Sequence, residues 1–279
     1  MKQLPMGFRD YLPEDIKKRD HLIDCMTTVV KQHQYQRIIT PVLENFNFLE
    51  KGLGALANDC IRFYDGAGTP LVLRPDHTTS IARIASTRLL DAMPIKLYYH
   101  DPVFRKDPLL GETEIFQFGC EQVGEISQKE EIQMIRMVHD ICAAVGLNDI
   151  EIHVSHPQLY ANMTTHHREA LRKGEVHLLP EIPRKGGADL AEKSPDLLAL
   201  LTQLVDVGMT NVFVNVGLFK DDSTYNGVFF DVVSRSFGKV IGSGGRYDSV
   251  LRAFNCTSNA FGFSLRLHYL EQALCRQTP

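Results

Sequence analysis

Polar side chains that could form a binding pocket gather in three segments of the chain, each beside an apolar, strand-like run. The segments read LRPDHTTSIAR (residues 73–83), VFRKDPLLGETEIFQFGCE (residues 103–121) and STYNGVFFD (residues 223–231). The first contributes Asp76 and Thr78, the second Arg105, and the third Tyr225 at the start of a strand. A carboxylate, hydroxyls, a guanidinium and a phenol together suit a small polar ligand with both donors and acceptors.

The second segment has a period of two in its polar residues. Gln117, Gly119 and Glu121 fall on one side of the expected strand, because successive side chains of a strand alternate between its faces. Phe116, Phe118 and Cys120 take the opposite side. Such a polar face fits either a solvent-exposed surface or the floor of a polar pocket.

Other site chemistries have weaker support in the sequence. The run VIGSGGRYD (residues 240–248) lacks the full spacing of a dinucleotide-binding loop, so a glycine turn between a strand and a helix is the better interpretation. The pairs His153/His156 and His166/His167 have no carboxylate or cysteine at familiar spacing, so no metal site is expected. The sequence also shows no serine nucleophile motif and suggests no cofactor.

The composition predicts a cytoplasmic protein without a membrane segment. The 279 residues are 44% hydrophobic and 23% charged, with a formal net charge of −4 that gives no general attraction to nucleic acid or membranes. Six scattered cysteines lack regular spacing and are expected to be reduced. The first twenty residues are too polar for a secretory signal.

The elements that would position the polar residues point to an α+β fold on one antiparallel sheet. Helical periodicity is expected over residues 13–35, 78–90 and 127–147, and a last helix after residue 264. Strands are expected over residues 36–45, 95–106, 114–124, 211–219, 227–236 and 238–245, and a hairpin over 62–76 turning at 65–68. Residues 157–207 are interpreted as a helical insertion in a single domain, 1–279.

Seven motifs occur in the order found in histidyl-tRNA synthetases, which the chain resembles over nearly its whole length. They are GFRDYLPED, TPVLE, LRPDHTTSIAR, the FR–EIFQFGCE pair, YNGVFFD, GGRYD and AFGFSLRL. The resemblance implies a class II aminoacyl-tRNA synthetase-like core, an antiparallel sheet flanked by helices. It also implies a homodimer formed through the region around Pro41.

The resemblance further implies a histidine pocket. Asp76 and Thr78 would hold the amino group of the ligand, Arg105 and Gln117 would lie near its carboxylate, and Glu121 and Tyr225 would read the imidazole, with Tyr247 nearby. Lys220 is the eighth residue expected at this effector site. These residue types fit the task, because a buried ammonium needs carboxylates and a neutral imidazole offers one donor and one acceptor.

Several positions depart from the synthetase pattern. Arg266 replaces a glycine that admits ATP, Tyr269 replaces a phosphate-binding arginine, and Thr113 stands where a second cation is expected. Lys220 replaces a catalytic arginine, whose planar fork an ammonium does not reproduce. The stretch Asp221-Asp222-Ser223-Thr224 also differs from the usual run and would repel phosphates.

With these departures, and with no anticodon-binding domain after the last motif, the chain resembles the regulatory subunits of ATP phosphoribosyltransferase. Such a subunit has no catalysis of its own and no need of tRNA. It would assemble with a short-form catalytic subunit, activate the first step of histidine biosynthesis, and take part in feedback inhibition by histidine. One alternative is a shortened synthetase-like enzyme that adenylates histidine or a related amino acid. Another is a different paralogue of the same core, such as a stand-alone amino-acid transferase or an inert dimerisation module.

Overall fold

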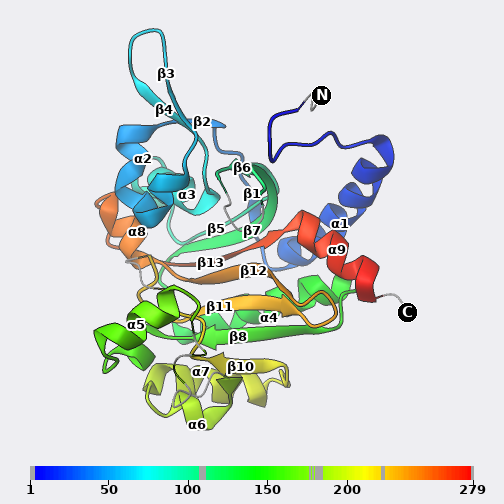
Figure 1. Ribbon diagram of the computed structural model, residues 1–279, viewed down its shortest axis with the longest axis vertical. Coiled ribbons are helices and arrows are strands. Elements are labelled where there is room, and N and C mark those ends of the chain that lie inside the picture. Colours follow the sequence, from blue (N-terminus) through cyan, green and yellow to red (C-terminus); the bar gives the residue numbers. More distant parts are fainter. Residues whose placement is uncertain are drawn as a thin grey trace.

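A ten-stranded sheet forms the centre of the molecule, with helices on both of its faces (Figure 1). The computed structural model describes residues 4–106, 111–175, 177, 179, 185–220 and 224–277. The strand order is β1-β5-β7-β13-β12-β11-β8-β10-β9, with β6 paired to β7. All pairings are antiparallel except those of β1 with β5 and of β8 with β10, so the expected α+β class is confirmed.

The strands of the large sheet are β1 Gln36–Arg37, β5 Ile95–Tyr99, β6 Pro102–Phe104, β7 Glu114–Gly124, β8 Ile150–Ser155, β9 Lys185–Gly186, β10 Val212–Asn215, β11 Phe229–Ser234, β12 Lys239–Arg246 and β13 Asn259–Arg266. A smaller antiparallel sheet has the order β2-β4-β3 and comprises β2 Leu43–Asn45, β3 Arg62–Tyr64 and β4 Pro70–Leu73.

The helices are α1 Pro13–Gln32, α2 Phe46–Leu53, α3 His77–Thr87, α4 Gln128–Ala144, α5 Thr165–Arg172, α6 Ala188–Ala191, α7 Pro195–Asp206, α8 Asp248–Ala253 and α9 Leu267–Gln277. Short 3-10 turns are η1 Gly54–Asp59, η2 Leu90–Ala92 and η3 Pro157–Tyr160. Within the described part of the chain, none of these helices is both long and apolar enough to cross a membrane.

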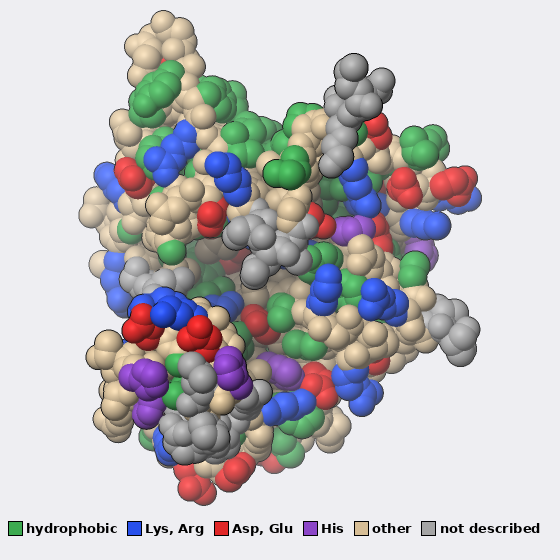
Figure 2. All heavy atoms as spheres, in the orientation of Figure 1, with side chains coloured by type: hydrophobic (Ala, Val, Ile, Leu, Met, Phe, Trp, Pro, Cys, Tyr) green, Lys and Arg blue, Asp and Glu red, His purple; other side chains and the backbone are tan. Residues whose placement is uncertain are grey.

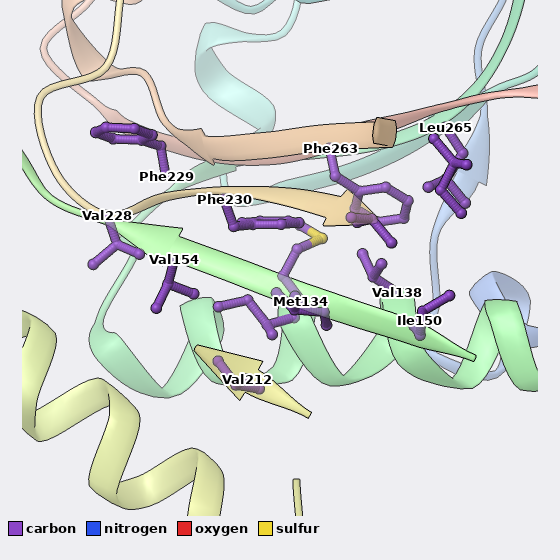
Figure 3. Close-up of a cluster of buried hydrophobic side chains, with 14 of the residues drawn as sticks. Met134, Val138, Ile150, Val154, Val212, Val228, Phe229, Phe230, Phe263 and Leu265 are labelled. Carbon is purple, nitrogen blue, oxygen red and sulfur yellow. The ribbon is translucent and has the colours of Figure 1, made fainter. Parts of the chain in front are cut away.

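One face of the sheet is apolar and packs on α4. This helix begins with a capping box between Ser127 and Glu130, which satisfies free amide groups of its first turn. Its buried side carries Met134 and Val138, which lie against Phe230 and Phe263 of the sheet (Figure 3). Because strand side chains alternate, this face takes every second residue of the central strands.

The opposite face is covered near one end by α2, α3 and α8, which enclose a second hydrophobic cluster. In β5, Leu97 and Tyr99 belong to this second cluster, while Tyr98 between them belongs to the cluster on α4. In β7, Phe118 and Cys120 turn toward α4, which leaves Gln117, Gly119 and Glu121 on the other face. The predicted alternation of this strand is therefore confirmed.

Two expected strands are each divided in the structure. The predicted strand 36–45 is two short strands, β1 and β2, which join different sheets on either side of Pro41. The predicted strand 95–106 breaks at His100 and Asp101 into β5 and β6, both of which pair with β7. A proline has no amide hydrogen for a ladder, so Pro41 and Pro102 favour such breaks. The hairpin of β3 and β4 turns as predicted.

A fully buried guanidinium holds the divided segment in place. Arg74 donates to the carbonyl oxygens of Thr40 and Pro102, each at 2.6 Å, and to the Thr40 hydroxyl at 3.0 Å. A buried charge is tolerated only when its donors are matched. Arg74 thereby ties the chain around Pro41 to β4 and β6.

The segment 157–207 contains α5, α6 and α7 and also β9, which pairs with β10 at the edge of the large sheet. Leu197, Leu200 and Leu204 of α7 belong to the same hydrophobic cluster as α4. The described part of this segment is thus packed against the sheet. Residues 176, 178 and 180–184 lie outside the described residues.

The packing on α4 predicts that substitutions on its buried side lower the free energy of unfolding more than substitutions on its exposed side. Met134→Ala removes a side chain buried against Phe230 and is expected to lower the free energy of unfolding by about 2–5 kcal/mol. Arg136→Ala, on the exposed side of the same helix, is expected to change it by about 0.5 kcal/mol or less. Urea denaturation of both variants measures the difference, and equal losses would contradict this packing.

Candidate functional site

Seven of the eight predicted site residues line one cavity of about 340 Å³ on the α3 side of the sheet. Figure 2 shows this face hollowed in its middle, beneath the layer of α2 and α3. The seven are Asp76, Thr78, Arg105, Glu121, Lys220, Tyr225 and Tyr247. They come from α3, β7 and the connecting segments, including Tyr247 between β12 and α8, so the fold brings distant parts of the sequence together.

Gln117 does not belong to the described lining of this cavity. It is buried on the same face of β7 as Glu121, but four residues away, and it pairs across the sheet with Arg266. Its predicted place near a ligand carboxylate stays a prediction.

Small residues on the neighbouring strands make room for the cavity. Gly262 and Ser264 of β13 and Ser243 and Gly244 of β12 line it. A Cβ atom at Gly262 would overlap Oε2 of Glu121, the residue opposite it in β7. The glycine therefore leaves space that the Glu121 carboxylate occupies.

Glu121 is only 1% exposed, and one of its two carboxylate oxygens has hydrogen-bond partners. Its Oε1 accepts hydrogen bonds from the hydroxyls of Thr78 at 2.9 Å and Tyr99 at 3.2 Å. Its Oε2 and the nearby Tyr247 hydroxyl are buried without a hydrogen-bond partner among the described residues. Burial raises the pKa of Glu121 to about 7, although the hydroxyls of Tyr247, Thr78 and Tyr99 oppose this shift.

Asp76 caps the N-terminus of α3 at the edge of the cavity. Its two oxygens accept from the Thr79 amide at 2.8 Å and the Thr79 hydroxyl at 3.1 Å. Burial raises the pKa of Asp76, although Thr79 and the Arg105 guanidinium oppose the rise. Arg105 donates to the Pro75 carbonyl at 2.8 Å. The start of α3 thus brings the Asp76 carboxyl group and the Arg105 guanidinium to the same cavity.

Lys220 and Tyr225 form the opposite wall. The Lys220 ammonium lies 3.4 Å from Asp231 and 4.9 Å from the centre of the Tyr225 ring. The Tyr225 ring in turn packs on Phe229 at 5.5 Å between centroids. The predicted departures at Asp221, Asp222 and Ser223 lie outside the described residues.

Two residues that matter to this cavity were missed by the sequence reasoning. Tyr99 donates to Glu121, and its ring stacks on His77 at 3.9 Å between centroids. Gly262 leaves the space that Glu121 fills. The alternating small residues of β13 were a signal for Gly262, whereas Tyr99 looks like an ordinary apolar strand residue.

The strand expected over residues 238–245 is confirmed as β12, whereas the glycine turn expected within VIGSGGRYD is wrong. Gly242, Gly244 and Gly245 lie within β12, and α8 begins only at Asp248. A side chain at Gly244 would collide with the Phe230 ring and with Cβ of Phe263, at 2.6 and 2.7 Å. The glycines thus allow close packing of neighbouring strands. Among the described residues no group of three or more histidine, cysteine, aspartate or glutamate side chains could hold a metal ion.

The raised pKa of Glu121 predicts a pH-dependent stability. An unfolded glutamate ionises near pH 4.5 and the folded one near pH 7, so the unfolded state binds fewer protons in this window and stability falls as pH rises through it. This ionisation lowers the free energy of unfolding by about 3 kcal/mol. Glu121→Gln removes the loss, because glutamine has the same shape but does not ionise. Relative to the wild type, the variant should gain stability between pH 5 and pH 8 in urea denaturation. A constant difference would contradict a neutral Glu121 at low pH.

Comparisons with known proteins agree with this fold. The family model described as histidyl-tRNA synthetase matches residues 7–205 and 179–270. An ATP phosphoribosyltransferase regulatory subunit from Synechococcus sp. (strain JA-3-3Ab) is 30% identical, over 99% of this chain and 75% of its own.

Two solved structures extend the comparison. A crystal structure of an ATP phosphoribosyltransferase regulatory subunit/histidyl-tRNA synthetase from Bacillus halodurans has a TM-score of 0.86 and 27% identity, over 98% of this chain and 83% of that one. The apo histidyl-tRNA synthetase of S. aureus, at 21% identity, shares the fold with a TM-score of 0.75 over 99% of this chain and 71% of that one. The chain therefore belongs to the histidyl-tRNA synthetase family, in the group of ATP phosphoribosyltransferase regulatory subunits.

Proposed function

We propose that this chain is a non-catalytic regulatory subunit of ATP phosphoribosyltransferase that senses histidine in the Glu121 cavity. It would act in the cytoplasm, bound to a short-form catalytic subunit, in the first step of histidine biosynthesis. The observation that carries the proposal is the buried Oε2 of Glu121, which has no hydrogen bond of good geometry among the described residues. The Tyr247 hydroxyl is close enough to favour the ionised carboxylate, but it too lacks a well-formed hydrogen bond among these residues. Buried polar atoms of this kind cost free energy unless a ligand completes them.

Histidine matches these groups. Its imidazole would donate one N–H to Oε2 of Glu121, and its second nitrogen would meet a tyrosine hydroxyl. Asp76 would face the ammonium group and Arg105 the carboxylate, which are the partners that buried charges require. Both residues line the same cavity as Glu121.

Three positions support the absence of adenylation. Tyr269 stands where the resemblance expects a phosphate-binding arginine, and its ring is buried against Phe237. Lys220 is paired with Asp231. The Thr113 hydroxyl donates to the carbonyl of Met6 at 3.0 Å. Neutralising phosphate charge is the main task of an adenylating site. Tyr269 and Thr113 carry no charge, and the one cation among these three, Lys220, already forms an ion pair with Asp231.

A homodimer through the region around Pro41 is part of the proposal. Ile39 is 71% exposed and Tyr64 is 74% exposed, and Val42 and Leu43 are also exposed. Figure 2 shows hydrophobic side chains gathered over the β2–β4 sheet. Contiguous apolar surface of this kind is typical of interaction sites.

The regulation would follow from linkage. Histidine that binds one conformation of the complex better than another shifts the activity of a docked enzyme, with a coupling of about 1–3 kcal/mol. The effect needs no catalysis by this chain.

The proposal predicts that Glu121→Ala desensitises the complex. We expect the histidine concentration for half-inhibition of phosphoribosyl-ATP formation to rise at least about tenfold, because one lost charged hydrogen bond is worth roughly 1.5–3 kcal/mol. Glu125→Ala, an exposed neighbour on the same chain segment, should keep the wild-type value. Unchanged inhibition in the Glu121 variant would rule out this pocket as the histidine sensor.

A second assay separates the regulatory role from the adenylating alternative. The isolated chain is expected to give no histidine-dependent exchange of pyrophosphate into ATP above a no-protein control, with a histidyl-tRNA synthetase as positive control. Exchange that requires histidine and disappears in Glu121→Ala would establish the enzyme instead. Exchange and activation are measured on the same preparation, so inactive protein cannot be mistaken for a non-catalytic one.

A further inference from the structure

A second open cavity, of about 470 Å³, lies behind the wall of the first. Tyr225 and Tyr247 face the first cavity, while their neighbours in sequence, Asn226, Arg246 and Asp248, face the second. The remaining lining comes from the start of α4, from η3 and the residue before it, from the start of α7 and from the segment just before β11. It consists of Gln128, Glu131, His156, Gln158, Asp196, Gly227 and Val228.

One of the two buried carboxylates here is satisfied by the protein. Asp248 is 2% exposed and accepts four hydrogen bonds of 3.0 Å or less. The donors are the side chains of Asn226, Arg246 and Asn259 and the amide of Ala260. Asp248 therefore has a structural role, since it ties the start of α8 to β12 and β13.

The other buried carboxylate is only partly satisfied. Glu131 is 5% exposed, and its Oε1 accepts from Nη1 of Arg246 at 3.2 Å. Its Oε2 has no hydrogen bond within the part of the chain that the structure describes. Arg246 thus serves two buried carboxylates at once. The exposed Arg252 reaches Asp248 only at 4.0 Å and does not line the cavity.

The other titratable groups that face the cavity do not supply the missing positive charge. Nδ1 of His156 accepts from the Gln158 amide at 3.1 Å, and burial lowers the pKa of this imidazole, so the ring is neutral near pH 7. Asp196 adds a further carboxylate, 3.9 Å from Nε2 of His156. The described lining therefore holds three carboxylates and one guanidinium.

A metal ion does not fit this lining, because among the described residues no group of three or more suitable ligands converges. We propose that the second cavity binds the primary ammonium group of a small polar molecule, with Glu131 as its principal partner and Asp196 at its mouth. An ammonium would complete the Glu131 carboxylate as a salt bridge in a mostly buried place, where such a pair is stronger than at the surface.

The behaviour of Glu131 without a ligand agrees with the proposal. Burial raises the pKa of this carboxyl to about 7 even though Arg246 opposes the shift, and Asp248 and Asp196 add to the rise. A bound cation would favour the ionised form. Amine binding should therefore strengthen as pH rises through about 7, with Arg246 and Asp248 charged throughout and His156 neutral at the upper end.

The test uses the full chain and 5-aminopentan-1-ol, with 1,5-pentanediol as the neutral control of equal length. Ligand-observed NMR at pH 8 measures binding. We expect the amine to bind and the diol not to bind, and Glu131→Gln to weaken the amine at least tenfold. Glu125→Gln, an exposed carboxylate before α4, should remain within twofold of the wild type. Circular dichroism verifies that each variant is folded.

Three outcomes decide the matter. Equal binding of amine and diol, or unchanged amine binding in Glu131→Gln, overturns the proposal. If Glu131→Gln does not fold, amine binding to the wild-type chain is measured between pH 6 and pH 8 instead. Amine binding that does not strengthen over this range overturns the proposal. The peptide acetyl-Gly-Lys-Gly-amide distinguishes sources: its binding assigns the site to a lysine side chain of a partner, and binding of the free amine alone assigns it to a small metabolite.

Discussion

The centre of the molecule is arranged around the buried Glu121 carboxylate, whose Oε2 has no hydrogen-bond partner among the described residues. A carboxylate inside a sheet is costly unless its lone pairs are used, and here Thr78 and Tyr99 satisfy one oxygen only. Gly262 must lack a side chain for the other oxygen to have its place. Contributions from α3, β5, β7 and β13 therefore converge on a single group, and in the proposed function a ligand would complete the second oxygen.

The two faces of the sheet differ in the polarity of the side chains that they bury. The face on α4 is continuous hydrophobic core, which supplies the burial that drives folding. The opposite face accepts buried polar groups, whose cost the core must offset. Because β7 and β13 alternate strictly, the same strands supply Phe118 and Phe263 to one face and Glu121 and Gly262 to the other.

Much of this arrangement could be predicted from the sequence. The period of two in β7 correctly separated Gln117, Gly119 and Glu121 from the aromatic side, and both ends of the capped helix α4 were placed within three residues. Predictions from local sequence patterns were wrong or missing where contacts between distant parts of the chain determine the structure. The glycines of β12 looked like a turn because glycine is a turn residue, but they serve close strand packing. Tyr99 was missed because only its partner, distant in sequence, gives its hydroxyl a role.

The most direct test of the account is a crystal structure of this chain with histidine at neutral pH. The account predicts the ligand in the Glu121 cavity, with one imidazole nitrogen within hydrogen-bond distance of Oε2 of Glu121 and the ammonium group near Asp76. Histidine bound at another place, or in this cavity with its imidazole turned away from Glu121, would contradict it.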